Sequence, residues 1–303
     1  MSERASLHPA PEVRVDRRFL GSSLAVTLWS CAIAHRRPSP EHAQKEFVLA
    51  FPHAGSFVLH TEGRSDLIDE GSVALFNAGE PYRTSHPHGC GDRGSTLVLP
   101  RAVLADILSE WDPEAPFRNG NLLSVAAVSP PAAYWRQRLL VARLGHGDGI
   151  DPLEAEETAL GIVREVLAAL RLPRRGRARR GGGSRGREIA EDARSHLRGA
   201  FPEPLGLAEL SARLRVSPFQ LCRAFRAHTG VPLHRYRTSL RLKAAIERLA
   251  GADLAGLAFD LGFASHSHFT SAFRREFGMT PSAARRLLAR GGRPAPTRIS
   301  GSS

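Results

Sequence analysis

The sequence has few cysteines and lacks long apolar runs. Its three cysteines, Cys31, Cys90 and Cys222, are an odd number and lie far apart, which argues against a disulfide framework. No apolar run approaches the roughly 20 residues needed to span a bilayer, and the N-terminus lacks the apolar region of a signal peptide. We therefore expect reduced cysteines, no membrane partner and a soluble, cytoplasmic protein.

Acidic residues are scarce in the second half of the chain. Residues 171–303 contain 26 Lys and Arg against 9 Asp and Glu, whereas residues 1–170 contain 16 against 21. A basic surface attracts a polyanion, because each neutralised phosphate releases condensed counterions. The length of 303 residues is enough for two domains, each with its own core. We therefore expect the basic half to bind nucleic acid.

The basic half contains a tandem repeat with a shift of 48 residues. The first copy has Ser217, Leu221, Phe225 and Gly230, and the second has Ser265, Phe269, Phe273 and Gly278. A hydroxyl residue followed by apolar residues four and eight positions later predicts an N-cap and one buried helix face, and the glycine predicts the helix end. A short helix is expected before each copy, over residues 207–214 and 254–261. This order of elements is typical of a helix-turn-helix.

The outward positions of the second helix in each unit are the candidates for contact with DNA. They are Phe219, Gln220, Cys222, Arg223 and Arg226 in the first unit, and His266, Ser267, His268, Ser271, Arg274 and Arg275 in the second. Arg223 is the strongest candidate for a base contact, because its guanidinium can form two hydrogen bonds to a guanine. His266 and His268 point about 200° apart on a helix and cannot chelate one ion.

Two connecting segments follow from the composition. Residues 232–249 have helical spacing and a proline suited to a first helical turn, so one continuous helix would hold the two units at a fixed separation. Residues 172–187 are rich in Gly and Arg and are expected to form a flexible linker, which either acts as a solvated tether or contacts DNA phosphates. Residues 291–303 have the composition of a disordered tail.

The acidic half has short strand-like runs followed by amphipathic stretches. Strands are expected at residues 24–33, 46–51, 56–61, 72–77 and 95–99, and helices at 101–111, 132–144 and 152–170. The spacing of the strands is typical of a barrel or sandwich. The last helix has an apolar stripe of Leu160, Val163, Leu167 and Leu170, which would form a dimer contact or cover the open face of the barrel.

Residues 188–290 resemble the DNA-binding domain of the AraC/XylS family of transcription regulators. The resemblance rests on DLGFASHSHFTSAFRREFGMTPSAARR, LSARLRVSPFQLCRAFRAHTGVPL and the connecting RLKAAIERL. It implies seven helices with two reading helices, and base-facing positions at Phe219, Cys222, Arg223, Ser267, His268 and Ser271. Two residues depart from the family pattern: Arg215 stands at a turn position that often holds Gly, and Ala284 stands where an aromatic residue often packs.

Residues 46–100 resemble the cupin-like N-terminal domains of such regulators, notably in FPHAGSFVLHTEG, GSVALFNAGEPYRTSHP and HGCGD. The expected fold is α+β: a cupin-like β-barrel with flanking helices over residues 1–171, the linker at 172–187, a helical domain with two helix-turn-helix motifs at 188–290, and the tail at 291–303. The partners implied are double-stranded promoter DNA and a small-molecule effector, with RNA polymerase and a second copy of the chain as further options. The candidate effector-binding residues are Phe51, His53, Phe57, His60, Phe76, Tyr82, Arg83 and His86.

The run His86, His88, Cys90 would share one face of a strand and could then bind a soft divalent metal. The intervening Pro87 and Gly89 favour a loop instead, and the usual cupin metal pattern is not reproduced. We therefore predict no metal, cofactor or catalytic residue. The leading interpretation is an effector-controlled transcription regulator. The alternatives are a metal-dependent cupin enzyme joined to a DNA-binding domain, and a regulator without a ligand.

Overall fold

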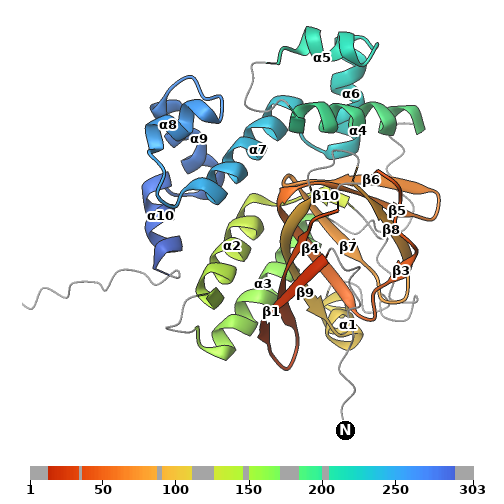
Figure 1. Ribbon diagram of the computed structural model, residues 1–303, viewed down its shortest axis with the longest axis vertical. Coiled ribbons are helices and arrows are strands. Elements are labelled where there is room, and N and C mark those ends of the chain that lie inside the picture. The colour runs from red at the N-terminus through yellow and green to blue at the C-terminus, as the bar shows by residue number, and fades with distance from the viewer. Residues whose placement is uncertain are drawn as a thin grey trace, which may run out of the picture.

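The computed structural model describes residues 13–33, 36–86, 91–110, 126–145, 150–170, 184–199 and 205–290. A β-rich N-terminal part is followed by a helical C-terminal part, which lies along one end and one side of the first (Figure 1). The predicted tail and most of the predicted linker lie outside the described residues. Residues 184–187 are a correction to the linker, because they begin helix α4 (Ser184–Gly199). In the part of the chain that is described, no helix is long and apolar enough to cross a membrane.

The N-terminal part contains two antiparallel sheets. The strands are β1 (Val13–Leu20), β2 (Ala25–Cys31), β3 (His42–Ala43), β4 (Phe47–Gly55), β5 (Phe57–Thr61), β6 (Arg64–Ile68), β7 (Ser72–Phe76), β8 (Pro81–Ser85), β9 (Asp92–Leu99) and β10 (Ala126–Val128). The larger sheet has the order β1-β2-β9-β4-β7-β10, and the smaller one has the order β3-β8-β5-β6. The chain passes between the two sheets six times, at every connection from β2 to β9 except the one between β5 and β6. The expected β-rich, cupin-like domain with flanking helices is confirmed, and its strands form two facing sheets that do not close into a barrel.

The five predicted strands correspond to β2, β4, β5, β7 and β9. The other five strands were not predicted, because they are very short or carry charged side chains that hide the apolar pattern. Strand β1, with the sequence VRVDRRFL, and β8, with PYRTS, both have several exposed residues. Each is held by a neighbouring strand in the sheet, β1 by β2 and β8 by β5, so pairing compensates for weak local preference.

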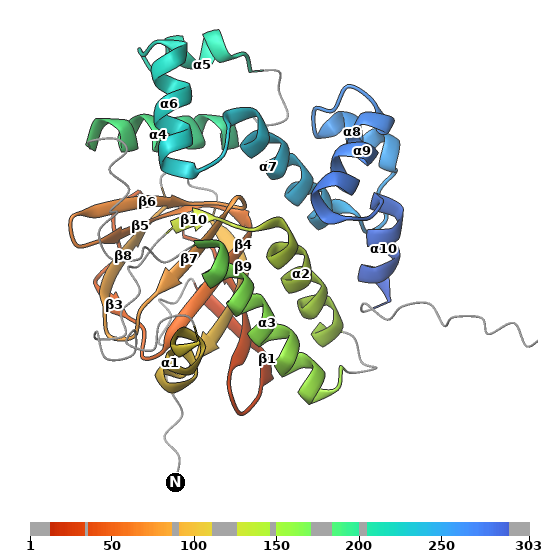
Figure 2. The same cartoon turned by 180° about the vertical axis from the view of Figure 1, so that it is seen from behind.

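Three helices of the N-terminal part cover the larger sheet: α1 (Arg101–Ser109), α2 (Pro131–Gly145) and α3 (Pro152–Leu170). Figure 2 shows α2 and α3 side by side along this sheet. Of the predicted apolar stripe, Val163 and Leu167 are fully buried within the chain, and Leu160 and Leu170 are half-buried against the same core. The structure thus supports the covering role of this apolar face rather than a dimer contact.

The described C-terminal part, residues 184–199 and 205–290, has seven helices, as the family resemblance implies. After α4 come α5 (Leu207–Arg213), α6 (Pro218–Thr229), α7 (Leu233–Arg248), α8 (Leu254–Asp260), α9 (His266–Phe277) and α10 (Pro281–Ala289). The side chains of Ser217 and Ser265 cap α6 and α9, and both helices end at a glycine in the left-handed conformation, Gly230 and Gly278. The tandem capped helices predicted from the repeat are confirmed.

The turns before the two capped helices differ in one respect. In the second unit, Gly262 takes the left-handed conformation with φ 76°, which costs glycine nothing. In the first unit the corresponding role falls to Arg215, with φ 53°, and it is the one non-glycine residue with positive φ among the described residues. A side chain at such a position costs about 1–2 kcal/mol. The backbone at Arg215, where the family often has Gly, is therefore locally strained.

We expect Arg215→Gly to raise the stability of the chain by about 1 kcal/mol, because the relief of the left-handed strain exceeds the added flexibility of the unfolded chain. Arg213→Gly is the matched control, since Arg213 is the last residue of α5, where glycine lowers helix stability and the substitution also removes the exposed ion pair with Glu209. The measurement is thermal unfolding of both variants beside the wild-type protein. An equal loss of stability in both would contradict the strain at Arg215.

Candidate nucleic-acid interface and sensor domain

All eleven predicted DNA-facing side chains on α6 and α9 are exposed in the folded chain. The opposite faces of the two helices are buried, with Leu221 and Phe225 on α6 and with Phe269 and Phe273 on α9. The most exposed apolar side chain among them is Phe219, which is 73% exposed. Each helix thus presents its candidate reading face to solvent while the rest of the chain remains packed.

The arginines of these faces are free of acidic partners within the described residues. No ion pair there involves Arg223, Arg226, Arg274 or Arg275, whereas Arg213 of α5 is paired with Glu209. The guanidinium of Arg223 lies 6.0 Å from the centre of the Phe219 ring, at the outer limit of a cation–π contact. Unpaired arginines on one face of a helix suit phosphate and base acceptors.

Gln220 has a second role that the sequence reading did not give it. Its side-chain oxygen accepts a hydrogen bond of 3.1 Å from the backbone N–H of Ser217, and its own backbone N–H donates to the Ser217 hydroxyl at 3.2 Å. These two bonds form a capping box at the start of α6. Gln220 therefore fixes the start of the reading helix, and only its remaining amide donors face outward.

Helix α7 joins the two units through its buried face. Tyr236 and Leu240 near its start pack with α4, α5 and α6, whereas Leu242, Ile246 and Leu249 near its end pack with α8, α9 and α10. The single helix confirms the connection predicted for residues 232–249. The two reading helices are consequently held at opposite ends of one rigid element (Figure 1).

The first unit is anchored on the turn between β6 and β7. Asp69 in this turn is fully buried and accepts hydrogen bonds of 2.9 and 2.7 Å from the Tyr236 hydroxyl. Burial raises the pKa of Tyr236 well above its ordinary value, so the hydroxyl stays protonated and donates. Arg194 of α4 lies 3.3 Å from Asp69 and donates to the Tyr236 oxygen at 3.0 Å. We call Asp69, Arg194 and Tyr236 the interdomain anchor.

The second unit is anchored on α2. Lys243 of α7 is fully buried, and its ammonium lies 3.3–3.4 Å from the backbone oxygens of Gly71 and Ser129 and 4.9 Å from the Tyr134 ring. Burial lowers the pKa of Lys243 to about 8. Glu247 accepts two hydrogen bonds from Arg138 of α2. The expectation of a separate core for each domain holds only in part: one apolar core continues from the larger sheet through α2 into α9 and α10, whereas the first unit has a cluster of its own among α4, α5, α6 and α7.

No part of this interface was predicted from the sequence. Asp69 stands in an ordinary turn sequence, and Arg194 and Tyr236 are surrounded by other polar residues. One signal was available: Lys243 is one of only two lysines among 42 basic residues, and it interrupts the buried face of α7. A lone lysine on an apolar helix face indicates a buried acceptor, here the backbone oxygens of Gly71 and Ser129 in the N-terminal domain.

The eight candidate effector-binding residues do not line one chamber. Phe57 and Phe76 lie between the two sheets, and Tyr82 packs beside them with its ring 4.8 Å from that of Phe76. Phe51 lies on the other face of the larger sheet, in the core beneath the helices. Successive residues of β4 point to opposite faces, and this alternation separates the set. The grouping of these residues into one site is therefore corrected, and Trp29 joins the cluster between the sheets.

The polar residues among the effector-binding candidates also lie in different parts of the domain. His53 is buried on the helix side, where it contacts Gln137 at 3.3 Å and Ser95 at 3.2 Å, and burial lowers its pKa well below the ordinary value. His60 lies on β5 between two serine hydroxyls, each at 2.8 Å, and burial lowers its pKa too. Arg83 is exposed and lies 3.7 Å from Glu41. The structure thus places these three residues in three different surroundings.

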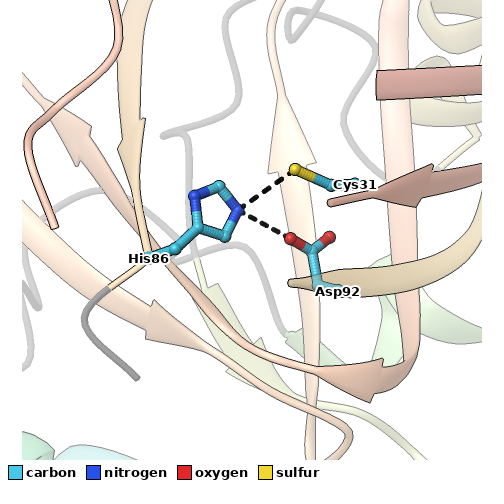
Figure 3. Close-up of side chains that lie close together, drawn as sticks. All are labelled: Cys31, His86 and Asp92. Carbon is cyan, nitrogen blue, oxygen red and sulfur yellow. Dashed lines mark hydrogen bonds and ion pairs between the residues drawn. The ribbon is translucent and has the colours of Figure 1, made fainter. Parts of the chain in front are cut away.

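His86 is brought close to two residues that the sequence reading did not connect with it. Its Nε2 atom lies 2.7 Å from a carboxylate oxygen of Asp92 and 3.5 Å from the sulfur of Cys31 (Figure 3). Burial alone would lower the pKa of His86, but the contacts with Asp92 and Cys31 outweigh it and raise the pKa to about 9. Cys31 and Cys222 are free thiols. His88 and Cys90, the other members of the predicted run, lie outside the described residues.

An N-terminal double-sheet domain packed against a helical domain with two helix-turn-helix units defines the class of protein. Comparison with known families agrees: the AraC-binding-like domain matches residues 7–172, and a helix-turn-helix domain matches residues 210–287. The first match covers more than half of the chain. The chain belongs to the AraC family of transcriptional regulators.

Individual relatives match smaller parts. The HTH-type transcriptional activator RhaS of Escherichia fergusonii is 37% identical over 83 residues, which are 27% of this chain and 30% of that protein. The HTH-type transcriptional regulator ArgR of Pseudomonas aeruginosa is 27% identical over 190 residues, 61% of this chain and 53% of that protein. The chain thus spans about half or less of these relatives. A structure of ToxT from Vibrio cholerae matches 88% of this chain and 99% of its own at 14% identity, with a TM-score of 0.35 that by itself supports no conclusion.

Proposed function

We infer that the chain is a sequence-specific regulator that reads promoter DNA with α6 and α9 and receives a small-molecule signal in its N-terminal domain. The observation that carries this proposal is the pair of capped helices with exposed reading faces at the two ends of α7. A helix in the major groove uses residues near its N-terminus for base edges, and basic residues further along it for phosphates. On α6, Phe219 and Arg223 lie in the first half of the helix, where side chains reach base edges. Arg226 lies in its last turn, where a basic side chain reaches phosphates.

The two units divide the reading task unequally. Helix α6 has the long side chains Phe219 and Arg223 in its first half, whereas the first half of α9 has Ser267, His268 and Ser271. Arg274 and Arg275 in the last turn of α9 are suited to phosphates. We therefore assign most of the base discrimination to α6, and orientation on the DNA backbone to α9.

The test is selection of bound fragments from genomic DNA by the purified full chain at physiological salt. The expected result is a motif with two elements about 10–10.5 base pairs apart, the spacing at which two helices enter successive major grooves on one side of the duplex. In a salt titration, the protein should bind the selected site more tightly than random DNA at every salt concentration. Enrichment without a motif, with affinity that collapses as salt rises, would mean that the basic half binds only the DNA backbone.

A further inference from the structure

Three metal-ligating side chains meet where the two sheets of the N-terminal domain come together. Cys31 is the last residue of β2 and Asp92 the first of β9, and they face each other as partners in the pairing of these strands. His86 follows β8, which belongs to the smaller sheet. Figure 3 shows the imidazole, the thiol and the carboxylate pointing toward one another. The cluster is thus assembled by the fold from three separate segments.

The distances are close to those of a tetrahedral zinc site. Zinc binds His nitrogen and carboxylate oxygen at about 2.0–2.2 Å and Cys sulfur at about 2.3 Å, so neighbouring ligand atoms lie roughly 3.3–3.6 Å apart. The Cys31 sulfur lies 3.5 Å from His86 Nε2, within this range. The Asp92 oxygen lies 2.7 Å from the same nitrogen and would move back by roughly 0.6 Å when an ion replaces the shared proton. All three donor atoms lie within 4.8 Å of one another.

The surroundings fix the ligands in place. The indole N–H of Trp29 donates a hydrogen bond of 2.6 Å to the other oxygen of Asp92, which leaves Oδ2 directed at His86. Such a bond to a ligating carboxylate is typical of the residues that support a metal site. His86 and Asp92 are buried, and Cys31 is half-buried. Gly91 has φ 62°, and a Cβ atom there would lie 2.3 Å from the backbone oxygen of Cys31, so only glycine brings Asp92 this close to β2.

A second group of potential ligands, Asp66, Glu191 and His228, is less suited to a cation. Arg64 already pairs with Asp66, and Arg194 with Glu191. Among the described residues, no arginine or lysine forms an ion pair with Asp92 of the Cys31, His86 and Asp92 cluster. Its partner is His86, another member of that cluster. Within the described part of the chain, the Asp92 carboxylate therefore has no permanently charged side chain beside it that would repel a cation.

We propose that Cys31, His86 and Asp92 bind a thiophilic divalent cation of the Zn²⁺ type, with a fourth position left for water or a further ligand. A mixed set of sulfur, nitrogen and oxygen donors with one open position is typical of zinc rather than of magnesium or calcium, which prefer oxygen alone. The ring of His86 lies 6.4 Å from that of Phe57, so the cation would lie at one end of the apolar cluster between the sheets. The site is independent of the proposed DNA reading.

The test is titration of the reduced, metal-free full chain with Co²⁺, which substitutes for zinc and reports thiolate ligation through a sulfur-to-cobalt charge-transfer absorption. We expect one equivalent of Co²⁺ to produce this absorption and the intense visible bands of a tetrahedral site, and Zn²⁺ to abolish both. Cys31→Ser should remove the charge-transfer absorption, and Cys222→Ser, the matched control at an exposed thiol on α6, should retain it. Trp29→Phe should keep all three ligands but weaken binding by about 10–100-fold.

Two results would overturn the proposal. One is the absence of a charge-transfer absorption in the wild-type chain, a result that depends on no variant. The other is an absorption of unchanged intensity in folded Cys31→Ser, which would assign the thiolate to another cysteine. DNA binding measured on the same preparations separates this outcome from a failure of the proposed function, because the reading helices do not include the cluster.

Discussion

Asp69→Ala should lower the free energy of unfolding of the full chain by about 3–5 kcal/mol, the cost of removing one partner from a buried ion pair. The substitution removes one of the two carboxylates beside the buried Arg194 guanidinium, which keeps Glu191 at 3.0 Å, and it removes the acceptor of the Tyr236 hydroxyl. It also removes the acceptor for the Ser72 hydroxyl and for the backbone N–H of Gly71. Chemical denaturation followed by circular dichroism measures the change.

Asp16→Ala is the matched control, because Asp16 is paired with Arg18 at the surface, with the two side chains 60% and 38% exposed. An exposed pair of this kind contributes less than about 1 kcal/mol. Tyr236→Phe removes only the hydroxyl that reaches across the interface, so a double-mutant cycle with Asp69→Ala isolates the coupling between the two domains. Equal losses in Asp69→Ala and Asp16→Ala, or zero coupling in the cycle, would contradict the interdomain anchor.

The anchor also constrains how a signal in the N-terminal domain can reach the DNA. The reading side chains of α6 and α9 are exposed while the two domains are packed together, so packing does not mask them. The first unit is held by the β6–β7 turn and the second by α2. A change in the N-terminal domain that shifts this turn or α2 would therefore act on α7 and on the two reading helices that it connects, and binding at two successive grooves is sensitive to their placement.

The DNA-binding half was predictable from the sequence because its structure is local. Ser217 and Gly230 cap and end α6 within one short segment, and the same pattern recurs in α9, so caps and apolar spacing determine the helices and their exposed faces together. The turn at Arg215 was recognised as unusual because the family that the sequence resembles often has Gly at this position. In the structure Arg215 has a left-handed backbone, a conformation that glycine adopts more easily than arginine.

The N-terminal half was less predictable because its sites depend on pairing between distant segments. Cys31 and Asp92 are 61 positions apart in the sequence and meet only because β2 pairs with β9. Phe51, His53 and Phe57 were predicted together as effector-binding residues. The alternation of side chains along β4 instead places Phe51 on the face of the larger sheet that the helices cover, whereas Phe57 lies between the two sheets. The face on which a side chain lies depends on strand register and on the order of strands in the sheet, and neither can be read from the residues of one segment alone.

Arg223→Ala should weaken binding to the selected DNA site by about 10–100-fold and change binding to random DNA far less. A guanidinium with two hydrogen bonds to a guanine provides about 1–3 kcal/mol of discrimination, and random DNA offers that contact only by chance. Arg223 has no acidic partner within the described residues, and its guanidinium lies over the Phe219 ring on the exposed face of α6. Its removal therefore costs little folding stability, and the effect belongs to recognition.

The measurement is fluorescence anisotropy titration of the selected site and of a scrambled duplex with the wild-type protein and each variant. Arg164→Ala is the matched control, since it removes the same charge from an exposed position on α3, where Arg164 is paired with Glu110, far in sequence from both reading helices. The control should bind both duplexes as the wild-type protein does. If Arg223→Ala instead weakens binding to both duplexes equally and lowers the salt dependence by about one ion, Arg223 contacts a phosphate, and the base discrimination of α6 must come from Phe219 and its other outward residues.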